Sequence, residues 1–217
     1  MPITDCLLSS EEEHELISLG TKLGFRKGET IFAAGQRAAE IHYILSGWVS
    51  VYKVTNQGTQ VSVGLRYRGE FAGLGSFACD GERGCSAQAL IDSEVVILPR
   101  DNFRALLRKY PVLNDKFFCL LGARLRETQN NMVYFIANQT DKRLALTLIN
   151  IGQYLGRPDG HRRQVNIRLP QEELAHIIGC SRQTVNNLLN EMRAAGSVEI
   201  NGREIVAVNP AKLATFL

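Results

Sequence analysis

The sequence predicts an α+β fold in three parts: a β-rich N-terminal domain, a long helix and a C-terminal winged helix-turn-helix. Three observations predict this arrangement. Short β-rich runs separated by glycines occupy residues 26–101, apolar residues recur at steps of three and four over residues 112–138, and two short amphipathic segments meet at Gly179.

The composition of the 217-residue chain sets outer limits. One large or two smaller domains fit this length, and a hydrophobic share of 45% supports a packed core. No apolar run approaches the roughly 18 residues of a membrane span, and the first residues lack the basic and apolar regions of a signal peptide. We therefore expect a cytoplasmic protein with no membrane partner.

Five cysteines are scattered along the chain without the paired spacing of a zinc site or a redox motif. They are Cys6, Cys79, Cys85, Cys119 and Cys180. We expect no metal site, and we expect reduced, buried thiols at Cys119 and Cys180 because both lie in apolar helical settings.

The N-terminal part reads as one short helix followed by strands. Residues 9–20 form the helix, with Ser9 or Ser10 as its cap and Gly20 at its end. Alternating runs predict strands within residues 29–36, 40–54, 59–67 and 93–101. Five glycines between the runs are expected in turns with positive φ, namely Gly28, Gly35, Gly47, Gly58 and Gly69. Many short strands with spaced turns predict a small barrel or sandwich.

A short helix over Asn102–Lys109 precedes the long one. Along the long helix a heptad seam recurs at Phe118, Leu121, Leu125, Thr128, Met132 and Phe135. Such a seam suits the pairing of two identical helices, although a single helix packed on its own barrel needs a similar stripe. Because about seven turns exceed what a small barrel can cover, we expect a homodimer paired along this helix. Arg124, Arg126 and Glu127 then lie on its flanks.

The segment QEELAHIIGCSRQTVNNLLN, residues 171–190, predicts the helix-turn-helix. Ala175 lets two helices approach, Gly179 permits the turn and Ser181 caps the second helix. An αα-corner in a helical core needs the same apolar positions. The outward face favours DNA binding instead, because its side chains suit hydrogen bonds to base edges; they are Arg182, Gln183, Asn186 and Asn187.

The segments around this motif agree with it. Asn138–Asp141 is the expected hinge, Lys142–Leu155 the next helix, and Gly156–Gly160 a loop. VEINGREIVAV, residues 198–208, predicts a hairpin at Asn201-Gly202, which serves as a wing with Arg203 as a phosphate contact. From Asp141 onward ten Lys or Arg face seven Asp or Glu, so the whole surplus of +3 lies in the half that is expected to neutralise phosphates.

Several motifs in order resemble one known family. They are KGETIFAAG from Lys27, IHYILSGWVSVY from Ile41, GEFAGLGSF from Gly69 and GCSRQTV from Gly179. With them the chain resembles a Crp–Fnr family transcription regulator from about Gly24 to its C-terminus. The resemblance implies a β-roll or jelly-roll sensor domain like that of cyclic-nucleotide-binding proteins over residues 1–110, a dimerisation helix over 111–138 and a winged helix-turn-helix over 139–217.

For DNA, the resemblance implies a palindromic operator read by the second helix. Arg182 suits guanine and Gln183 suits adenine, while Ser181 and Thr184 suit phosphates. The family usually has Glu at the position of Gln183 and often Arg at that of Asn187. We therefore expect bases that differ from the common half-sites TGTGA and TTGAT. In relatives the loop matching Gly156–Gln164 can touch RNA polymerase, which makes an activator plausible.

The sensing signal is left open by the sequence. The family's cyclic-AMP binders have a Glu within the segment matching Gly73-Leu74-Gly75 and an Arg directly before the Ser that matches Ser86; this chain lacks both and has Cys85 at the second position. Arg83 shares a strand face with Cys85 and partly substitutes. We expect a small, anionic effector of unknown identity, not cyclic AMP, between the barrel and the long helix, contacted also by Thr128 and Gln129.

Three alternatives to this effector are weighed. One is thiol redox sensing by Cys79 and Cys85, with Arg83 lowering a thiol pKa. Another is a constitutive DNA binder whose barrel senses nothing. The third is an enzyme, but no G-x-S-x-G, H-E-x-x-H, P-loop or G-x-G-x-x-G stands in a suitable context, so we expect no catalytic residues and no enzyme.

Overall fold

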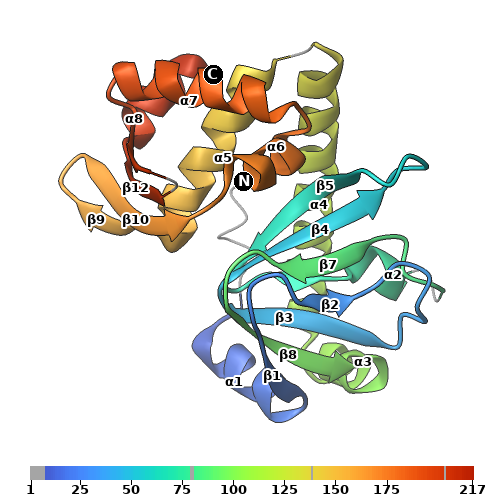
Figure 1. Cartoon of the computed structure of the whole chain (residues 1–217). Coiled ribbons are helices and arrows are strands. Elements are labelled where there is room, and N and C mark those ends of the chain that lie inside the picture. Colours follow the sequence, from blue (N-terminus) through green and yellow to red (C-terminus); the bar gives the residue numbers. More distant parts are fainter. Residues whose placement is uncertain (1–7, 79–80, 138, 203) are drawn as a thin grey trace. The chain divides into compact units, whose positions relative to one another are not determined.

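A computed structural model describes residues 8–78, 81–137, 139–202 and 204–217. The chain divides into two units, Met1–Gln129 and Asn130–Leu217, with the division inside helix α4 (Pro111–Ile136; Figure 1). Cys6, Cys79 and Arg203 lie outside the described residues.

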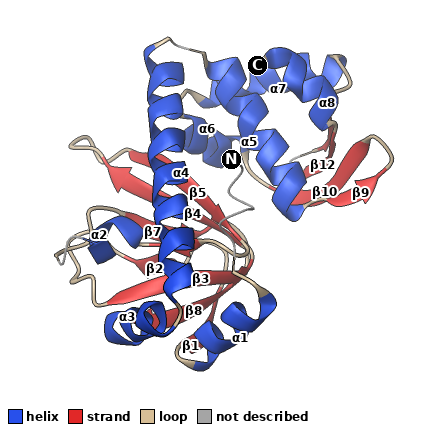
Figure 2. Ribbon diagram, turned by 180° about the vertical axis from the view of Figure 1, so that it is seen from behind, coloured by secondary structure: helices blue, strands red, loops and turns tan. Residues whose placement is uncertain are grey.

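The N-terminal unit contains two antiparallel four-stranded sheets, with orders β1-β8-β3-β6 and β2-β7-β4-β5 (Figure 2). The strands are β1 (Thr21–Phe25), β2 (Thr30–Phe32), β3 (Glu40–Ser46), β4 (Trp48–Val54), β5 (Gln60–Tyr67), β6 (Phe71–Ala72), β7 (Ser86–Ala89) and β8 (Ser93–Pro99). Phe32, Ile44, Val51 and Ala87 from both sheets share one buried cluster. This packing confirms the predicted β-roll or sandwich.

Successive side chains of strand β3 point to opposite faces of its sheet, and the five central residues of the strand are all buried. Both faces of the strand are therefore covered. Ile41 and Tyr43 pack in a cluster with residues of the unit's helices, while Ile44 packs with the second sheet. These helices are α1 (Ser10–Ser18), α2 (Leu74–Ala78), α3 (Arg100–Lys109) and the first part of α4. Tyr43 and Trp48 are core residues.

Local sequence signals explain the ends of these elements. Ser9 caps α1 and forms a capping box with Glu12, in which Ser9 N donates to Glu12 Oε2 over 2.7 Å. The five glycines predicted in turns all have positive φ, between 80° and 98°. Gly47 also lies against Ser93, so a side chain would not fit there.

Helix α4 carries the predicted seam, and several of its apolar side chains face solvent. Phe118, Leu125 and Met132 are 70%, 60% and 62% exposed, and Thr128 is exposed with them. Leu121 instead packs against the core of the N-terminal unit. The side chain of Phe135 lies outside the description.

Among its described residues, the C-terminal unit contains the end of α4, the helices α5 to α8, a short 3₁₀ turn and a sheet of order β11-β12-β10-β9. Its elements are α5 (Thr140–Leu155), β9 (Arg157–Asp159), β10 (Arg162–Arg168), α6 (Gln171–Ile178), α7 (Arg182–Ala194), β11 (Val198–Asn201), β12 (Glu204–Val208), α8 (Pro210–Leu213) and the turn η2 (Ala214–Phe216). Leu144, Leu148 and Ile151 of α5 are fully buried at its centre.

Two expectations are corrected. The loop at residues 156–160 is largely a hairpin, because β9 pairs antiparallel with β10 around Gly160, whose φ is 55°. Asp159-Gly160 is itself a strong hairpin signal. Cys119 is disulfide-bonded and not a reduced thiol, whereas Cys180 is free.

Candidate nucleic-acid interface and sensor site

Helices α6 and α7 form a tight helix-turn-helix. Gly179 ends α6 in the left-handed conformation, with φ 69° and ψ 51°. Its N–H and that of Cys180 both donate to Ala175 O, over 2.8 and 3.1 Å. Ala175 on α6, where the sequence predicts a close approach of the helices, and Val185 on α7 are both buried.

Ser181 begins the second helix as its N-cap. Its Oγ accepts a hydrogen bond from Thr184 N over 3.1 Å and lies 2.9 Å from Thr184 Oγ1. Both hydroxyls therefore sit at the positive end of α7, where the helix dipole favours an anion such as a DNA phosphate.

The outward face of α7 is polar. Arg182, Gln183 and Asn187 are exposed, and Gln183 Nε2 donates to Asn187 Oδ1 over 3.3 Å. Asn186 is half-buried, and its Oδ1 accepts from Gln171 Nε2 of α6 over 3.1 Å. The structure thus brings Arg182, Gln183 and Asn187 to the surface and ties Asn186 to the neighbouring helix.

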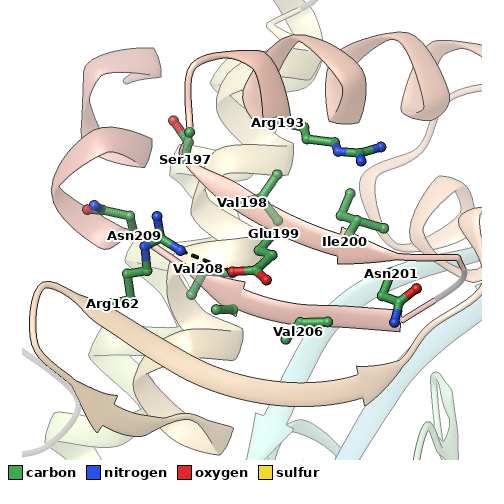
Figure 3. A pocket seen from close by; sticks show the side chains of 12 residues that line it. Arg162, Arg193, Ser197, Val198, Glu199, Ile200, Asn201, Val206, Val208 and Asn209 are labelled. Carbon is green, nitrogen blue, oxygen red and sulfur yellow. Dashed lines mark hydrogen bonds and ion pairs between the residues drawn. The ribbon is translucent and has the colours of Figure 1, made fainter.

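The hairpin β11–β12 follows α7 directly, and Gly202 in its turn has φ 60°. Beside the hairpin lies an open pocket of ≈ 560 Å³ whose lining includes Arg162, Arg193 and Glu199 (Figure 3). Arg162 on β10 and Glu199 on β11 form an exposed ion pair of 3.0 Å across β12. The predicted wing is therefore present, although Arg203 lies outside the described residues.

Arg83 is a buried arginine among the residues that the sequence predicts for the effector. It is only 4% exposed, and its guanidinium stacks over the Phe32 ring at 4.0 Å. Its Nη2 donates to Glu40 O over 2.8 Å and lies 3.5 Å from His42 Nδ1. Its Nη1 is buried without a hydrogen-bond partner among the described residues and lies where a Cβ on Gly73 would be. The absence of a side chain at Gly73 thus leaves room for the arginine.

The charge of Arg83 also acts on His42. Burial, and then the nearby guanidinium, lower the pKa of His42 to about 3. The imidazole is therefore neutral at physiological pH.

The other predicted sensor residues differ in burial and in their hydrogen-bond partners. Leu74 is buried and Gly75 is exposed. Ser86 Oγ accepts from Ala34 N over 3.0 Å. Thr128 and Gln129 are exposed on α4, and Thr128 Oγ1 donates to Arg124 O of its own helix over 2.9 Å.

Cys85 is half-buried beside the core cluster of the two sheets. Burial raises the pKa of its thiol, and the positive charges of Lys53 and Arg66 only partly oppose this effect. Fewer thiolates at neutral pH mean a less reactive cysteine.

Sequence reasoning missed a partly buried group of four charges, which we call the charge quartet: Arg66, Glu70, Arg124 and Glu127. Arg124 lies 2.6 Å from Glu70 and 2.6 Å from Glu127, while Arg66 lies 3.9 Å from Glu127. Glu70 is 1% exposed, and its Oε2 accepts from Tyr67 N over 3.0 Å.

The charge quartet joins the end of β5 and the following turn to α4. Arg124 and Glu127 therefore face the sheets and do not lie on the flanks of a seam, as the sequence had suggested. Burial, and then the neighbouring Arg124, lower the pKa of Arg66 to about 10. The available signal was Arg124 and Glu127 at a spacing of three, which places both on one helical face.

Both parts of the chain match known domain families. Residues 22–110 match the cyclic nucleotide-binding domain, and residues 142–216 match the Crp-like helix-turn-helix domain. The chain belongs to the Crp–Fnr family of transcription regulators. Members of this family bind DNA through the helix-turn-helix, act as dimers and are typically controlled by an effector.

Named relatives of this Crp–Fnr regulator span nearly its whole length. A CRP-like cAMP-activated global transcriptional regulator of Mycobacterium tuberculosis is 28% identical over 190 residues, which cover 88% of this chain and 85% of the relative. The fumarate and nitrate reduction regulatory protein of Salmonella typhimurium is 24% identical over 215 residues, covering 97% and 86%.

The fold of the regulator is similar to that of FixK2 from Bradyrhizobium japonicum. The TM-score is 0.77 at 20% identity, with 91% of this chain and 96% of the other covered. In the part of the chain that the structure describes, no helix has both the length and the hydropathy to cross a bilayer. The same part contains no group of three or more side chains suited to a metal ion.

Proposed function

We propose that this regulator reads a palindromic DNA operator with α7 as its recognition helix. The observation that carries the proposal is the exposed face of Arg182, Gln183 and Asn187 at the capped end of a helix whose opposite face is buried. Arg182 makes no hydrogen bond or ion pair within the described residues, so its fork is available for guanine O6 and N7. Because the ligand is chromosomal DNA, the protein acts in the cytoplasm.

Gln183 and Asn187 add a second base-reading element. Their mutual hydrogen bond orients both amides, and an amide pairs with adenine N6 and N7. Ser181 and Thr184 contact phosphates at the start of the helix and set its register. Arg203 and the hairpin turn supply a further phosphate contact.

Selection from random duplexes with the full-length protein tests this proposal. We expect a palindrome whose half-sites lie about one helical turn apart and whose bases differ from TGTGA and TTGAT. Arg182→Ala lowers discrimination at one position by about 1–3 kcal/mol. The matched control is Asn190→Ala, also exposed on α7 but two turns further on. Enrichment of no palindrome, or equal losses in both variants, contradicts the proposal.

We propose that α4 pairs with the same helix of a second chain. Phe118, Leu125 and Met132 recur at intervals of seven and are each at least 60% exposed, which leaves a continuous apolar line on a single chain. A homodimer covers this line and places two recognition helices on two half-sites, as a palindrome requires.

We propose further that Arg83 holds a small, anionic effector other than cyclic AMP. Its buried Nη1 lacks a partner among the described residues, and an unpaired buried donor costs about 1–3 kcal/mol until an acceptor reaches it. The effector lies between the sheets and α4, with Thr128 and Gln129 as contacts from the helix. By binding one state of the dimer more tightly, it changes the affinity for DNA.

Thermal melting with a panel of anionic metabolites tests the effector. A ligand at 100 times its Kd stabilises the native state by about 2.7 kcal/mol. Arg83→Gln loses this stabilisation, whereas Arg68→Gln, a more exposed arginine of the same unit, retains it. If nothing in the panel stabilises the wild type, the constitutive alternative gains support; if Arg83→Gln responds normally, the effector binds elsewhere.

The thiol-redox alternative has less support. The raised pKa of Cys85 disfavours the thiolate that such a sensor needs, and Cys79 lies outside the described residues. DNA binding is measured for the wild type and for Cys85→Ser, with and without oxidant, to decide between the effector and the thiol. If oxidant changes the DNA affinity of the wild type but not that of the variant, sensing requires the Cys85 thiol.

We propose RNA polymerase as a further partner, which makes this regulator an activator. The hairpin β9–β10, whose turn lies within Gly156–Gln164, exposes Arg157, His161 and Arg162, and Arg162 also lines the pocket of Figure 3. His161→Ala with Arg157→Ala is expected to lower transcription in vitro while operator affinity stays unchanged. A parallel loss of DNA binding contradicts this assignment.

A further inference from the structure

Arg143 connects three helices of the C-terminal unit through one guanidinium. Its Nε donates to Ile178 O over 2.7 Å, its Nη1 to Tyr134 O over 2.9 Å, and its Nη2 to Thr140 Oγ1 over 3.2 Å. The side chain is only 7% exposed, although it is a cation. A buried arginine that donates hydrogen bonds to acceptors on three elements restrains these elements together.

Two of these acceptors lie at the C-terminal ends of helices. Ile178 is the last residue of α6, and Tyr134 lies in the last turn of α4. Carbonyls in a last turn have no partner within their own helix, and they form the negative end of the helix dipole. The guanidinium therefore caps α4 and α6 at the same time.

The position of Ile178 links this double cap to the recognition helix. Gly179 and Cys180 are the only residues between Ile178 and Ser181, the N-cap of α7, and both donate to Ala175 O. This short, hydrogen-bonded turn leaves α7 little freedom relative to the end of α6. A shift of the last turn of α4 is thus transmitted to α7 through Arg143.

We propose that Arg143 is the positioning residue of the recognition helix, fixing the angle of α7 to the last turn of α4. The inference rests on the proposed reading of DNA by α7. Arg143 itself does not contact a base. It acts by holding the two α7 helices of a dimer at the separation that an operator with fixed half-site spacing requires.

The test uses the full-length protein and the operator that selection with the wild type returns. Affinity is measured for this operator, for operators with one base pair more or fewer between the half-sites, and for an unrelated duplex of equal length. Arg143→Met is expected to bind the operator about tenfold more weakly, the equivalent of one lost base contact. Binding to the unrelated duplex stays within about twofold, because the phosphate contacts remain.

The spacing series supplies the readout that a structural role alone would not change. The wild type prefers one spacing, and Arg143→Met discriminates less among the three. Arg143→Lys keeps the charge, but its single ammonium group cannot bridge both carbonyls. Its spacing preference is therefore expected to lie between those of the wild type and Arg143→Met. Its milder change also keeps the test open if Arg143→Met folds poorly.

Leu148→Ala is the matched control, because Leu148 is fully buried on the same helix and its side chain cannot form a hydrogen bond to a carbonyl. It lowers the melting temperature, yet at a temperature where the protein is folded it keeps the spacing preference. The inference is overturned if Arg143→Met keeps the spacing preference of the wild type. It is also overturned if Leu148→Ala loses this preference to the same extent as Arg143→Met. Failure of the wild type to select any palindrome would instead contradict the proposed function.

Discussion

The buried His42 makes the stability of the N-terminal unit depend on pH. Its folded-state pKa of about 3 lies below the ordinary 6.5 expected for the unfolded chain. As pH falls, the unfolded chain therefore takes up the proton first. The stabilisation is complete above pH 6.5 and is lost progressively as pH falls toward 3.

The size of the effect follows from these two values. Between pH 7.5 and pH 5.0 a single group with this shift lowers the free energy of unfolding by about 2 kcal/mol. That is a substantial part of the roughly 5–15 kcal/mol that is typical of a folded domain. The loss should therefore appear as a lower denaturant concentration at the midpoint of unfolding.

Urea denaturation at fixed protein concentration measures the effect. The only tryptophan, Trp48, is fully buried in the N-terminal unit, so its fluorescence reports on this unit. His42→Gln removes the titrating group but keeps an acceptor for Arg83, and we expect the pH dependence between 7.5 and 5.0 to flatten. His14→Gln, at an exposed position, leaves it unchanged. A His42→Gln protein that retains the whole 2 kcal/mol loss would refute the reasoning.

Three further predictions concern other parts of the molecule. Glu70→Gln leaves the charge of Arg124 buried and poorly compensated, and we expect a loss of about 3 kcal/mol in urea denaturation followed by Trp48 fluorescence. Leu125→Glu places charges in the helix seam and yields monomers in analytical ultracentrifugation, whereas Arg126→Glu at an exposed flank stays dimeric. Ser181→Ala removes the N-cap of α7 and costs about 1 kcal/mol in thermal unfolding of the C-terminal unit, measured by circular dichroism. An unchanged urea midpoint in Glu70→Gln would contradict the first prediction. A dimeric Leu125→Glu protein would contradict the second, and an unchanged melting curve of Ser181→Ala the third.

The helices and the main strands could be predicted because their signals are local. Ser9 and Ser181 occupy caps, Gly179 takes the left-handed conformation, and the heptad positions of α4 give its length. The hairpin β9–β10 was missed even though Asp159-Gly160 marks it, because its first strand has three residues, too few for an alternating pattern. Strand β6 has two residues and exists only through its pairing with β3.

The sensor site could be predicted only in part, since its residues come from distant positions. The sequence indicated Arg83 and Gly73, but their contact requires the fold to bring β6 and the segment before β7 together. The charge quartet was missed because Arg66 and Glu70 lie far along the chain from Arg124. Arg143 was missed because two of its three acceptors are backbone carbonyls, which any residue supplies, and the third is the Thr140 hydroxyl of its own helix.

The charge quartet also limits how this sensor can change in evolution. Two arginines and two glutamates balance one another, and three of the four side chains are at most 14% exposed, so replacing one of those three leaves a poorly compensated charge. A lineage that acquires a different effector at this boundary between sheet and helix must therefore exchange these residues in pairs, or pass through a destabilised intermediate. Substitutions around Arg83 carry no such requirement for pairing, which makes that end of the site the easier route to a new ligand.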